Sequence, residues 1–226
     1  MPQVDLTGPA GRVEGLLEEV ASARFAALVC HPHPRYGGTM HNHATYRLAR
    51  AVRACGGTTL RFNYRGVGRS AGSYDKGRGE ALDARAALAF LRSHDPEHPL
   101  LCVGFSFGAW MAVACAVEQG LVGLLLAGLP IAPVEVEAVG LPDRVRATPL
   151  PIAVVQAEGD QFGAPAEVRE FLAGSAGPRR LTTVPRTTHL FEEDLPGLEK
   201  EAREATRWLL ADRVGRLDRE GRGSVP

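Results

Sequence analysis

The stretch LLCVGFSFGAWMAVACAV, residues 100–117, decides the fold of this chain. It opens with the apolar run LLCVGF, turns at a serine between two Gly-containing dipeptides, and continues as a second, longer apolar run. A short apolar run bounded by a turn is typical of a buried strand, and a longer one directly after it is typical of a packed helix. We therefore predict a strand at 100–105, a tight turn at Ser106 and a helix over 107–120.

The same alternation extends outward from this stretch in both directions. Further strands are predicted at 25–30, 58–64, 122–128, 151–158 and 179–185, and further helices at 44–56, 79–94, 164–174 and 195–214. Residues 3–20 contain the turn GPAG at 8–11 and are predicted to form a β-hairpin. Strands that alternate with helices form βαβ units. The sequence therefore predicts an α/β fold with a mainly parallel sheet flanked by helices.

Length and composition are those of one globular domain. The chain has 226 residues, of which 45% are hydrophobic and 23% charged, an ordinary balance for a folded protein. Apolar periodicity ends after Leu210, where glycine and charged residues take over. We expect a single domain at 1–210 and a charged C-terminal tail at 211–226 that frays.

Charge and cysteine content restrict the partners and the compartment. Lys plus Arg equals Asp plus Glu at 26 each, so no overall field attracts nucleic acid or an anionic membrane, and a small molecule is the expected partner. The four cysteines stand singly, and Cys30 and Cys102 lie within apolar runs, as buried thiols do. No N-terminal signal pattern and no membrane-length apolar run is found. We expect a reduced, cytoplasmic protein.

The turn GFSFG, residues 104–108, has the pattern G-x-S-x-G, in which a strand-to-helix turn exposes a nucleophilic serine. At such a turn the serine backbone is strained, and only small residues two positions before and two after it avoid the neighbouring strand and helix. This steric requirement explains the glycines at positions 104 and 108. The alternative is a Gly- and Ser-rich turn without chemistry, and the strand and helix around Ser106 favour the nucleophile.

A nucleophilic serine needs a base and an acid that orients the base. On a sheet with this turn the chain order is serine, acid, histidine. His189 is the only histidine after Ser106 and follows the last predicted strand. Asp143 and Asp160 are the two aspartates between them, and Asp160 is preferred because it follows a strand at its carboxyl end. Glu158 is a close second choice.

The segment HPHPRYGGTMHNH, residues 31–43, holds four of the seven histidines. It follows the predicted strand 25–30, where a loop supplies one amide of an oxyanion hole, while the residue after the nucleophile, Phe107, supplies the other. Because proline lacks an amide hydrogen, His33 is the candidate donor of this turn. A metal site is the weaker alternative, since the segment has no cysteine and no H-E-x-x-H pattern. The roles of His31, His41 and His43 stay open.

A dinucleotide site is a second alternative, suggested by NYRGVGRSAG at 63–72. The fingerprint requires its third glycine at position 71, but the glycine stands at 72, and the next helix begins only after further polar residues. The spacing disfavours a nucleotide, and no cofactor and no metal is expected.

The motifs CHPHPRYGGTMHN, RFNYRGVGRSAGSYDKGRGE, GFSFG, AEGD and TTHLF occur in this order and resemble the small bacterial α/β-hydrolases known as lidless serine carboxylesterases. The resemblance extends from about Val4 to Leu210. It implies an α/β-hydrolase fold with an eight-stranded sheet, a triad of Ser106, Asp160 and His189, and main-chain donors from His33 and Phe107. Two features depart from the family: VVQAEGD lacks the usual His-Gly before the acid, and TMHNH is unusually rich in histidine.

The expected activity is hydrolysis of short-acyl carboxylic esters through an acyl-enzyme. The connection from 128 to 151, where many relatives insert a lid, has roughly twenty residues, so the site should be open and offer little enclosure for long acyl chains. Candidate pocket walls are Tyr36, Phe105 and Phe162. A thioesterase or small-peptide peptidase on the same triad, or a non-catalytic binding module, is the alternative. The protein is expected to be a monomer or homodimer.

Overall fold

The computed structural model describes residues 3–131 and 140–220, with side chains up to Ala211. Its strands form one eight-stranded sheet in the order β1-β2-β4-β3-β5-β6-β7-β8. They are β1 (Gln3–Gly8), β2 (Gly11–Glu18), β3 (Phe25–Cys30), β4 (Gly57–Phe62), β5 (Leu100–Phe105), β6 (Leu121–Ala127), β7 (Ile152–Ala157) and β8 (Arg179–Val184). The β1–β2 and β2–β4 pairs are antiparallel and the other pairs are parallel. The predicted mainly parallel sheet and the N-terminal hairpin are confirmed.

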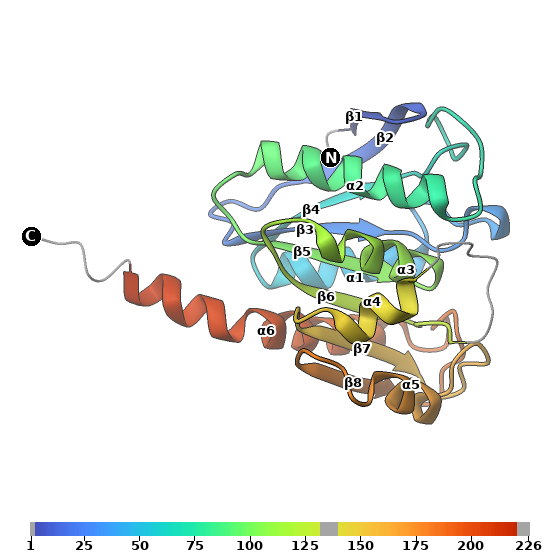
Figure 1. Cartoon of the computed structure of the whole chain (residues 1–226), viewed down its shortest axis with the longest axis vertical. Coiled ribbons are helices and arrows are strands. Elements are labelled where there is room, and N and C mark those ends of the chain that lie inside the picture. Colours follow the sequence, from blue (N-terminus) through green and yellow to red (C-terminus); the bar gives the residue numbers. More distant parts are fainter. Residues whose placement is uncertain (1–2, 132–139, 221–226) are drawn as a thin grey trace, which may run out of the picture.

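Helices cover both faces of the sheet (Figure 1). They are α1 (His43–Ala54), α2 (Arg78–His94), α3 (Phe107–Ala114), α4 (Leu141–Ala147), α5 (Pro165–Leu172) and α6 (Leu195–Glu220), with 3-10 turns η1 (Pro34–Tyr36) and η2 (Cys115–Val117). One buried cluster joins apolar residues of α1 and α6 to one face, and a second joins residues of α2, α3, α4 and α5 to the other. The fold therefore has three layers, with the sheet in the middle.

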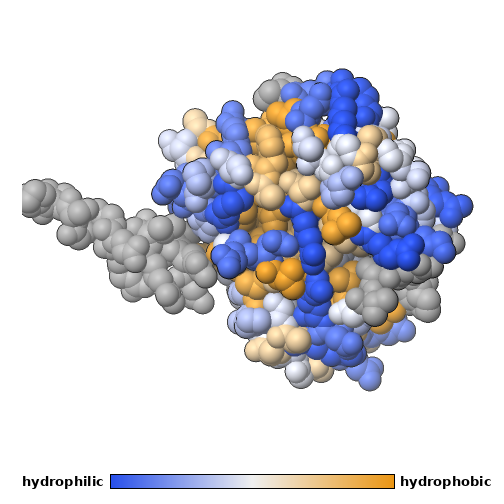
Figure 2. All heavy atoms as spheres, turned by 45° about the horizontal axis from the view of Figure 1, so that its top comes forward, coloured by the Kyte–Doolittle hydropathy of each residue, from blue (hydrophilic) through white to orange (hydrophobic). Residues whose placement is uncertain are grey.

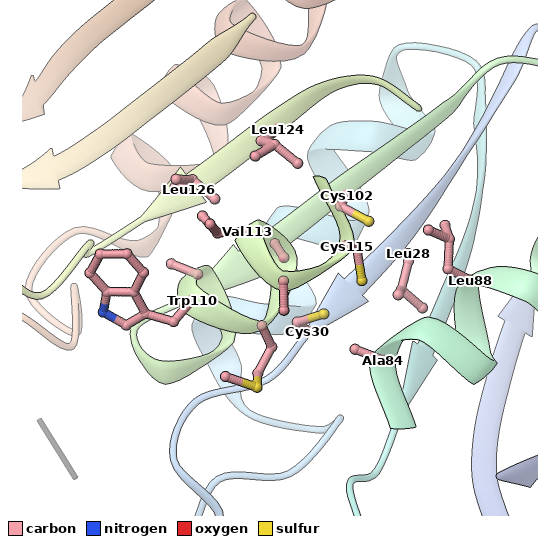
Figure 3. Packing of buried hydrophobic residues seen from close by; sticks show 14 of the residues in the cluster. Leu28, Cys30, Ala84, Leu88, Cys102, Trp110, Val113, Cys115, Leu124 and Leu126 are labelled. Atoms are coloured by element: carbon pink, nitrogen blue, oxygen red, sulfur yellow. The ribbon is translucent and has the colours of Figure 1, made fainter. Parts of the chain in front are cut away.

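The core between the sheet and α3 also holds three thiols. Cys30, Cys102 and Cys115 are free and buried among apolar side chains such as Leu28 and Val113 (Figure 3). Burial raises the pKa of the Cys30 and Cys102 thiols well above the usual range, so both stay protonated. These cysteines act as small apolar side chains, as their place in apolar runs predicts.

The surface mixes polar and apolar residues. Figure 2 shows hydrophilic side chains interspersed with apolar patches on the face turned toward the viewer. In the described part of the chain, no helix combines the length and the apolar character that crossing a membrane requires.

Two boundaries differ from the expectation. The helix predicted over 107–120 ends at Ala114 and continues as the turn η2, and the last helix, predicted to end at 214, runs on to Glu220. The domain boundary at 210 and the fraying of the tail stay predictions, and residues 221–226 of that tail lie outside the described residues.

The parallel strands place their carboxyl ends at one edge of the sheet. The loops after β3, β4, β5, β6, β7 and β8 therefore gather there. In open α/β sheets this edge is where sites form. Ser106, Asp160, His189 and His33 all belong to these loops.

Candidate active site

Ser106 lies at the junction of β5 and α3, in a backbone conformation that non-glycine residues rarely adopt. Its φ is 55° and its ψ is −121°. Its amide donates to the Ala127 carbonyl of β6 at 2.9 Å, which fixes the turn to the sheet. A Cβ at Gly104 would lie 2.0 Å from the Gly108 carbonyl oxygen, and one at Gly108 would lie 2.3 Å from the Cys30 carbonyl oxygen. Both glycines are thus required for the tight strand-to-helix turn, as the sequence predicts.

His189 reaches Ser106 from the loop after β8. The Ser106 hydroxyl donates to Nε2 of His189 at 2.8 Å. The imidazole is buried, with the Phe162 ring 4.7 Å and the Phe105 ring 5.6 Å from it between ring centres. This packing fixes the plane of the imidazole, and the hydroxyl proton has a direct path to Nε2.

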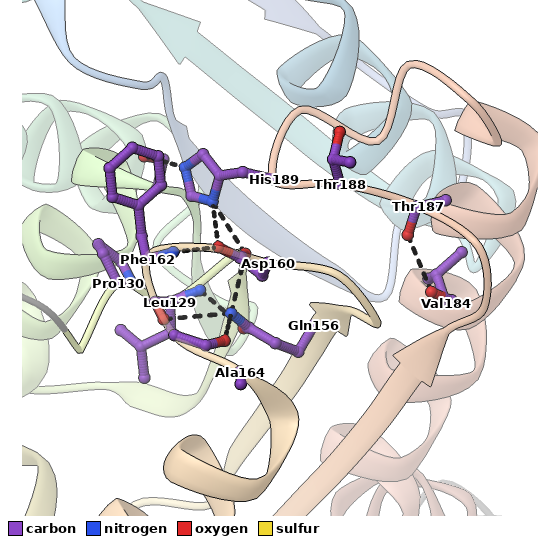
Figure 4. A network of polar contacts seen from close by, with 12 residues as sticks. Leu129, Pro130, Gln156, Asp160, Phe162, Ala164, Val184, Thr187, Thr188 and His189 are labelled. Atoms are coloured by element: carbon purple, nitrogen blue, oxygen red, sulfur yellow. Dashed lines mark hydrogen bonds and ion pairs between the residues drawn. The ribbon is translucent and has the colours of Figure 1, made fainter.

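Asp160 holds the other side of the imidazole (Figure 4). Nδ1–H of His189 donates to both carboxylate oxygens, at 2.9 and 2.8 Å. The same carboxylate accepts from the Phe162 amide at 2.9 Å and from Nε2 of Gln156 at 2.9 Å. A proton on Nδ1 leaves Nε2 as the acceptor for Ser106, so the contacts select the tautomer that a general base needs.

The alternative acids lie elsewhere. Asp143 is on α4, where its carboxylate is exposed and lies 3.8 Å from Arg146. Glu158 is exposed and accepts from the Arg186 amide at 2.7 Å. Of the three candidates it is therefore Asp160 that the structure brings to His189.

The loop after β3 lies against the start of α3. The His33 ring packs edge-on against the Phe107 ring at 4.9 Å between ring centres. Nδ1 of His33 accepts from the Arg35 amide at 3.2 Å, which leaves Nε2–H to donate to the Tyr74 hydroxyl at 3.0 Å. The carbonyl of His33 accepts from the Gly38 amide at 3.1 Å, so the loop is folded on itself. That the His33 and Phe107 amides bind an oxyanion stays a prediction.

His31, whose role the sequence leaves open, braces this loop. It is fully buried, donates from Nδ1 to the Pro32 carbonyl at 2.7 Å and accepts at Nε2 from the Tyr64 amide at 3.2 Å. Burial lowers the pKa of His31 from 6.5 to about 3, so its imidazole is neutral near neutral pH. His41 and His43, in contrast, are exposed.

The candidate pocket residues differ in exposure. Tyr36 is 77% exposed beside His33, and Phe162 is 38% exposed beside His189. Phe105 is fully buried and its ring packs between His189 and Phe191, so it supports the imidazole from the protein interior. Leu190, next in the chain to His189, is 50% exposed. Exposed leucines are common, and sequence reasoning did not single this one out.

Gln156 is the other residue that sequence reasoning did not assign. It is a fully buried polar side chain in the apolar strand β7 and bonds directly to Asp160. A glutamine within PIAVVQAE is the signal that could have identified it, because buried polar groups need hydrogen-bond partners.

Other sites have less support. Among the described residues, no cluster of three or more His, Cys, Asp or Glu side chains could hold a metal ion. A hollow of about 490 Å³ lies between α2 and the turn before β6, lined by Arg85, Leu88, Ala89, Arg92, Leu100, Val117, Glu118 and Gln119. It contains none of the predicted site residues. Its arginines already donate to the Ala114 and His98 carbonyls.

Comparison with protein families and solved structures gives consistent matches. A family model described as "Alpha/beta hydrolase domain" matches residues 27–197. An α/β serine hydrolase homologue from Coxiella burnetii is 29% identical with a TM-score of 0.82, over 90% of this chain and 96% of that one. Protein XC6422 from Xanthomonas campestris, described as a serine hydrolase without a lid, is 32% identical with a TM-score of 0.80, over 92% and 94% of the two chains.

A curated protein also resembles the chain. The uncharacterised protein RP471 of Rickettsia prowazekii (strain Madrid E) is 42% identical over 132 residues, which make up 58% of this chain and 56% of that protein. The chain thus spans little more than half the length of this curated relative.

Proposed function

This chain belongs to the alpha/beta hydrolase family and has the α/β-hydrolase fold, and from that premise we propose that it hydrolyses short-acyl carboxylic esters with Ser106 as the nucleophile. One observation carries the proposal: the hydrogen-bonded series from Ser106 Oγ through the imidazole of His189 to the Asp160 carboxylate, with contacts of 2.8 Å at each side of the ring. In the reaction the serine loses its proton to a base that an acid orients, and this series supplies all three groups.

In the first half of the reaction Ser106 Oγ attacks the ester carbonyl carbon while Nε2 of His189 takes the hydroxyl proton. The resulting imidazolium is stabilised by the Asp160 carboxylate at Nδ1–H. The tetrahedral intermediate then expels the alcohol, which receives its proton from Nε2. An acyl group remains on Ser106.

In the second half a water molecule replaces the alcohol. His189 removes a proton from the water, the hydroxide attacks the acyl carbon, and Ser106 leaves with the proton that His189 returns. The products are a carboxylic acid and the free enzyme, so no cofactor takes part.

The oxyanion of each tetrahedral intermediate is proposed to accept from the amides of His33 and Phe107. The contact between their rings supports this assignment because it brings the loop after β3 to the start of α3. Backbone donors that are already in position stabilise developing charge without reorganisation.

The preference for short acyl groups follows from an open site. The solved relative from Xanthomonas campestris is described as lidless, and among the described residues the large hydrophobic side chains exposed beside His33 and His189 are Tyr36, Phe162 and Leu190. A site with little enclosure gains little from each added methylene.

The reaction type is tested by turnover of an oxyester, a thioester and an anilide that carry the same short acyl group. The proposal predicts the highest kcat/KM for the oxyester. A higher value for the thioester or the anilide would instead identify a thioesterase or a peptidase on the same triad, and binding without turnover of any of them would identify a binding module.

The ligand proposed for the site is a small ester, with no nucleic acid and no membrane as partner. A cytoplasmic location and a monomeric or homodimeric state are proposed with it. Sedimentation of the purified protein tests the oligomeric state, because a monomer and a homodimer differ twofold in mass.

A further inference from the structure

Gln156 has an unusual position for a glutamine. It lies in the middle layer of the fold, on β7, and its side chain is fully buried. Its Oε1 accepts from the Leu129 amide at 2.9 Å, and its Nε2 lies 2.8 Å from the Gly163 carbonyl oxygen and 2.9 Å from Oδ2 of Asp160. A third acceptor, the Leu129 carbonyl oxygen, lies at 3.3 Å. Both ends of the amide are therefore fully used (Figure 4).

These contacts join two loops at the carboxyl edge of the sheet. Leu129 follows β6, whereas Asp160 and Gly163 follow β7, and a further bond from the Ile131 amide to the Phe162 carbonyl at 2.7 Å ties the same two loops together. Phe162 in turn donates its amide to Asp160 and packs on His189. One buried amide thus fixes the carboxylate, the loop beside it and the aromatic ring over the imidazole.

We propose that Gln156 is a positioning residue of the triad: it holds the Asp160 carboxylate in the orientation that keeps the His189 proton on Nδ1 and Nε2 aimed at Ser106. The inference rests on the proposed function, because it assigns a part in the proton transfer of that site. Gln156 touches Asp160 and not the reacting atoms, so it acts through the acid.

The amide chemistry is specific to this arrangement. Nε2 carries two hydrogens and faces the Asp160 and Gly163 oxygens, while Oε1 faces an amide hydrogen. In Gln156→Glu a protonated carboxyl can donate only one hydrogen, so the Asp160 and Gly163 oxygens can no longer both accept from residue 156, and an ionised carboxyl would put two negative groups side by side. In Gln156→Met the volume is similar and every hydrogen bond is lost.

Two charged groups near His189, Glu158 and Glu193, bond to the loop that carries it. Glu158 accepts from the Arg186 amide at 2.7 Å, and Glu193 accepts from the Thr188 hydroxyl at 2.7 Å and from the Thr188 amide at 3.2 Å. Both carboxylates therefore hold the backbone of the loop that carries His189. Gln156, in contrast, bonds to the Asp160 carboxylate itself.

The test is the pH profile of ester hydrolysis for the intact chain and for Gln156→Met and Gln156→Glu, with Gln119→Met as a matched control at an exposed position remote from Ser106. For both Gln156 variants we expect kcat to fall about 10- to 100-fold with KM little changed, because misplacement of an orienting group costs turnover and not binding. The acid limb of kcat/KM should move to higher pH, because a carboxylate that lacks this donor stabilises the imidazolium more strongly. The control should match the wild type.

A second readout does not need turnover. The proton between Nδ1 of His189 and Asp160 gives a low-field NMR resonance, which we expect in the wild type and the control and expect shifted or lost in the Gln156 variants. If Gln156→Met fails to fold, Gln156→Glu carries the test.

A wild-type kcat, acid limb and low-field resonance in a folded Gln156 variant would overturn the inference. A wild-type protein that hydrolyses no ester, or that keeps its activity in Ser106→Ala, would overturn the proposed function instead. In that case the resonance alone decides whether Gln156 orients Asp160.

Discussion

Ser106 combines a strained backbone with the proposed role of nucleophile. Its φ of 55° with ψ of −121° lies where a side chain clashes with its own backbone, and only glycine occupies the region freely. The surrounding contacts, including the amide bond to Ala127, hold it there. The strain at Ser106 lowers the stability of the fold, and the same backbone conformation places the hydroxyl beside the imidazole of His189.

We therefore predict opposite effects of Ser106→Gly on activity and stability. The variant should lose ester hydrolysis and gain about 1–2 kcal/mol in the free energy of unfolding, because glycine removes the backbone strain. Ser106→Ala should lose activity with little gain. Urea unfolding measures the stability of the two variants, and ester turnover measures their activity. Equal stability of the two variants would show that the strain is absent.

His31 is a residue-scale device of a different kind. Its neutral imidazole joins the Pro32 carbonyl to the Tyr64 amide, and protonation would add a second donor where Nε2 now accepts. Since burial lowers its pKa from 6.5 to about 3, the unfolded chain binds a proton between these values that the folded chain does not. The stability contributed by this group is complete above pH 6.5 and is lost as the pH falls below it.

The prediction is a pH-dependent stability gap between the wild type and His31→Gln, which cannot titrate. Above pH 7 the wild type should be the more stable, because glutamine does not reproduce both hydrogen bonds. Below pH 6.5 the wild type should lose up to about 1.4 kcal/mol per pH unit relative to the variant. Denaturant unfolding at several pH values measures the gap, and a gap independent of pH would contradict the account.

At the scale of elements, the contact between α3 and β3 determines where Ser106 lies. Gly108, in the first turn of α3, lies directly against the Cys30 and His31 carbonyl oxygens at the end of β3. This approach also brings Phe107 to His33. One packing contact therefore places Ser106 beside the loop that carries His33.

Gly108→Ala tests this contact. A Cβ there would lie 2.3 Å from a backbone oxygen, so α3 must move away, and we expect a loss of several kcal/mol or a loss of at least about 100-fold in kcat. Gly37→Ala is the matched control, because its Cβ would meet nothing within 4 Å and only its φ of 79° adds strain, about 1 kcal/mol. Thermal unfolding and ester turnover measure both variants, and equal effects would exclude the steric explanation.

Apolar patterning predicted the elements well and their ends less well. The strand at 100–105 and the hairpin at 3–20 agree with β5 and with β1–β2. The helix after Ser106, in contrast, ends at Ala114, whose carbonyl accepts from Arg85 and Arg144 of other helices. Hydrogen bonds from side chains distant in the sequence to a helix end are a tertiary effect, which the local sequence does not predict.

The same distinction applies to the site. That His189 and Asp160 lie together beside Ser106 could be predicted, because chain order, uniqueness and strand ends restrict the candidates before any contact is known. Gln156 could be singled out as a polar residue in an apolar strand, but its partners could not be predicted, because they belong to two loops that meet only in the folded chain. The pocket residues followed from aromatic character alone, which does not separate the buried Phe105 from the exposed Phe162.

For the whole molecule, the decisive feature is the edge of the sheet at which six loops meet. A solved relative of this chain is described as lidless. We predict that kcat/KM falls with acyl length, by at least about tenfold from butyrate to decanoate esters, because the proposed open site has little apolar surface to enclose a long acyl chain. A series of p-nitrophenyl esters measures this below their micellar concentrations. A rise with chain length would require an acyl groove.

One paired measurement tests whether Ser106 is the nucleophile of an ester hydrolase. The wild type and Ser106→Ala are compared for p-nitrophenyl acetate hydrolysis and for labelling by a fluorophosphonate, with the labelled residue located by mass spectrometry. The account predicts turnover and a label on Ser106 in the wild type, and neither in the variant. Turnover that survives the substitution, or a wild type that takes no label, would contradict it.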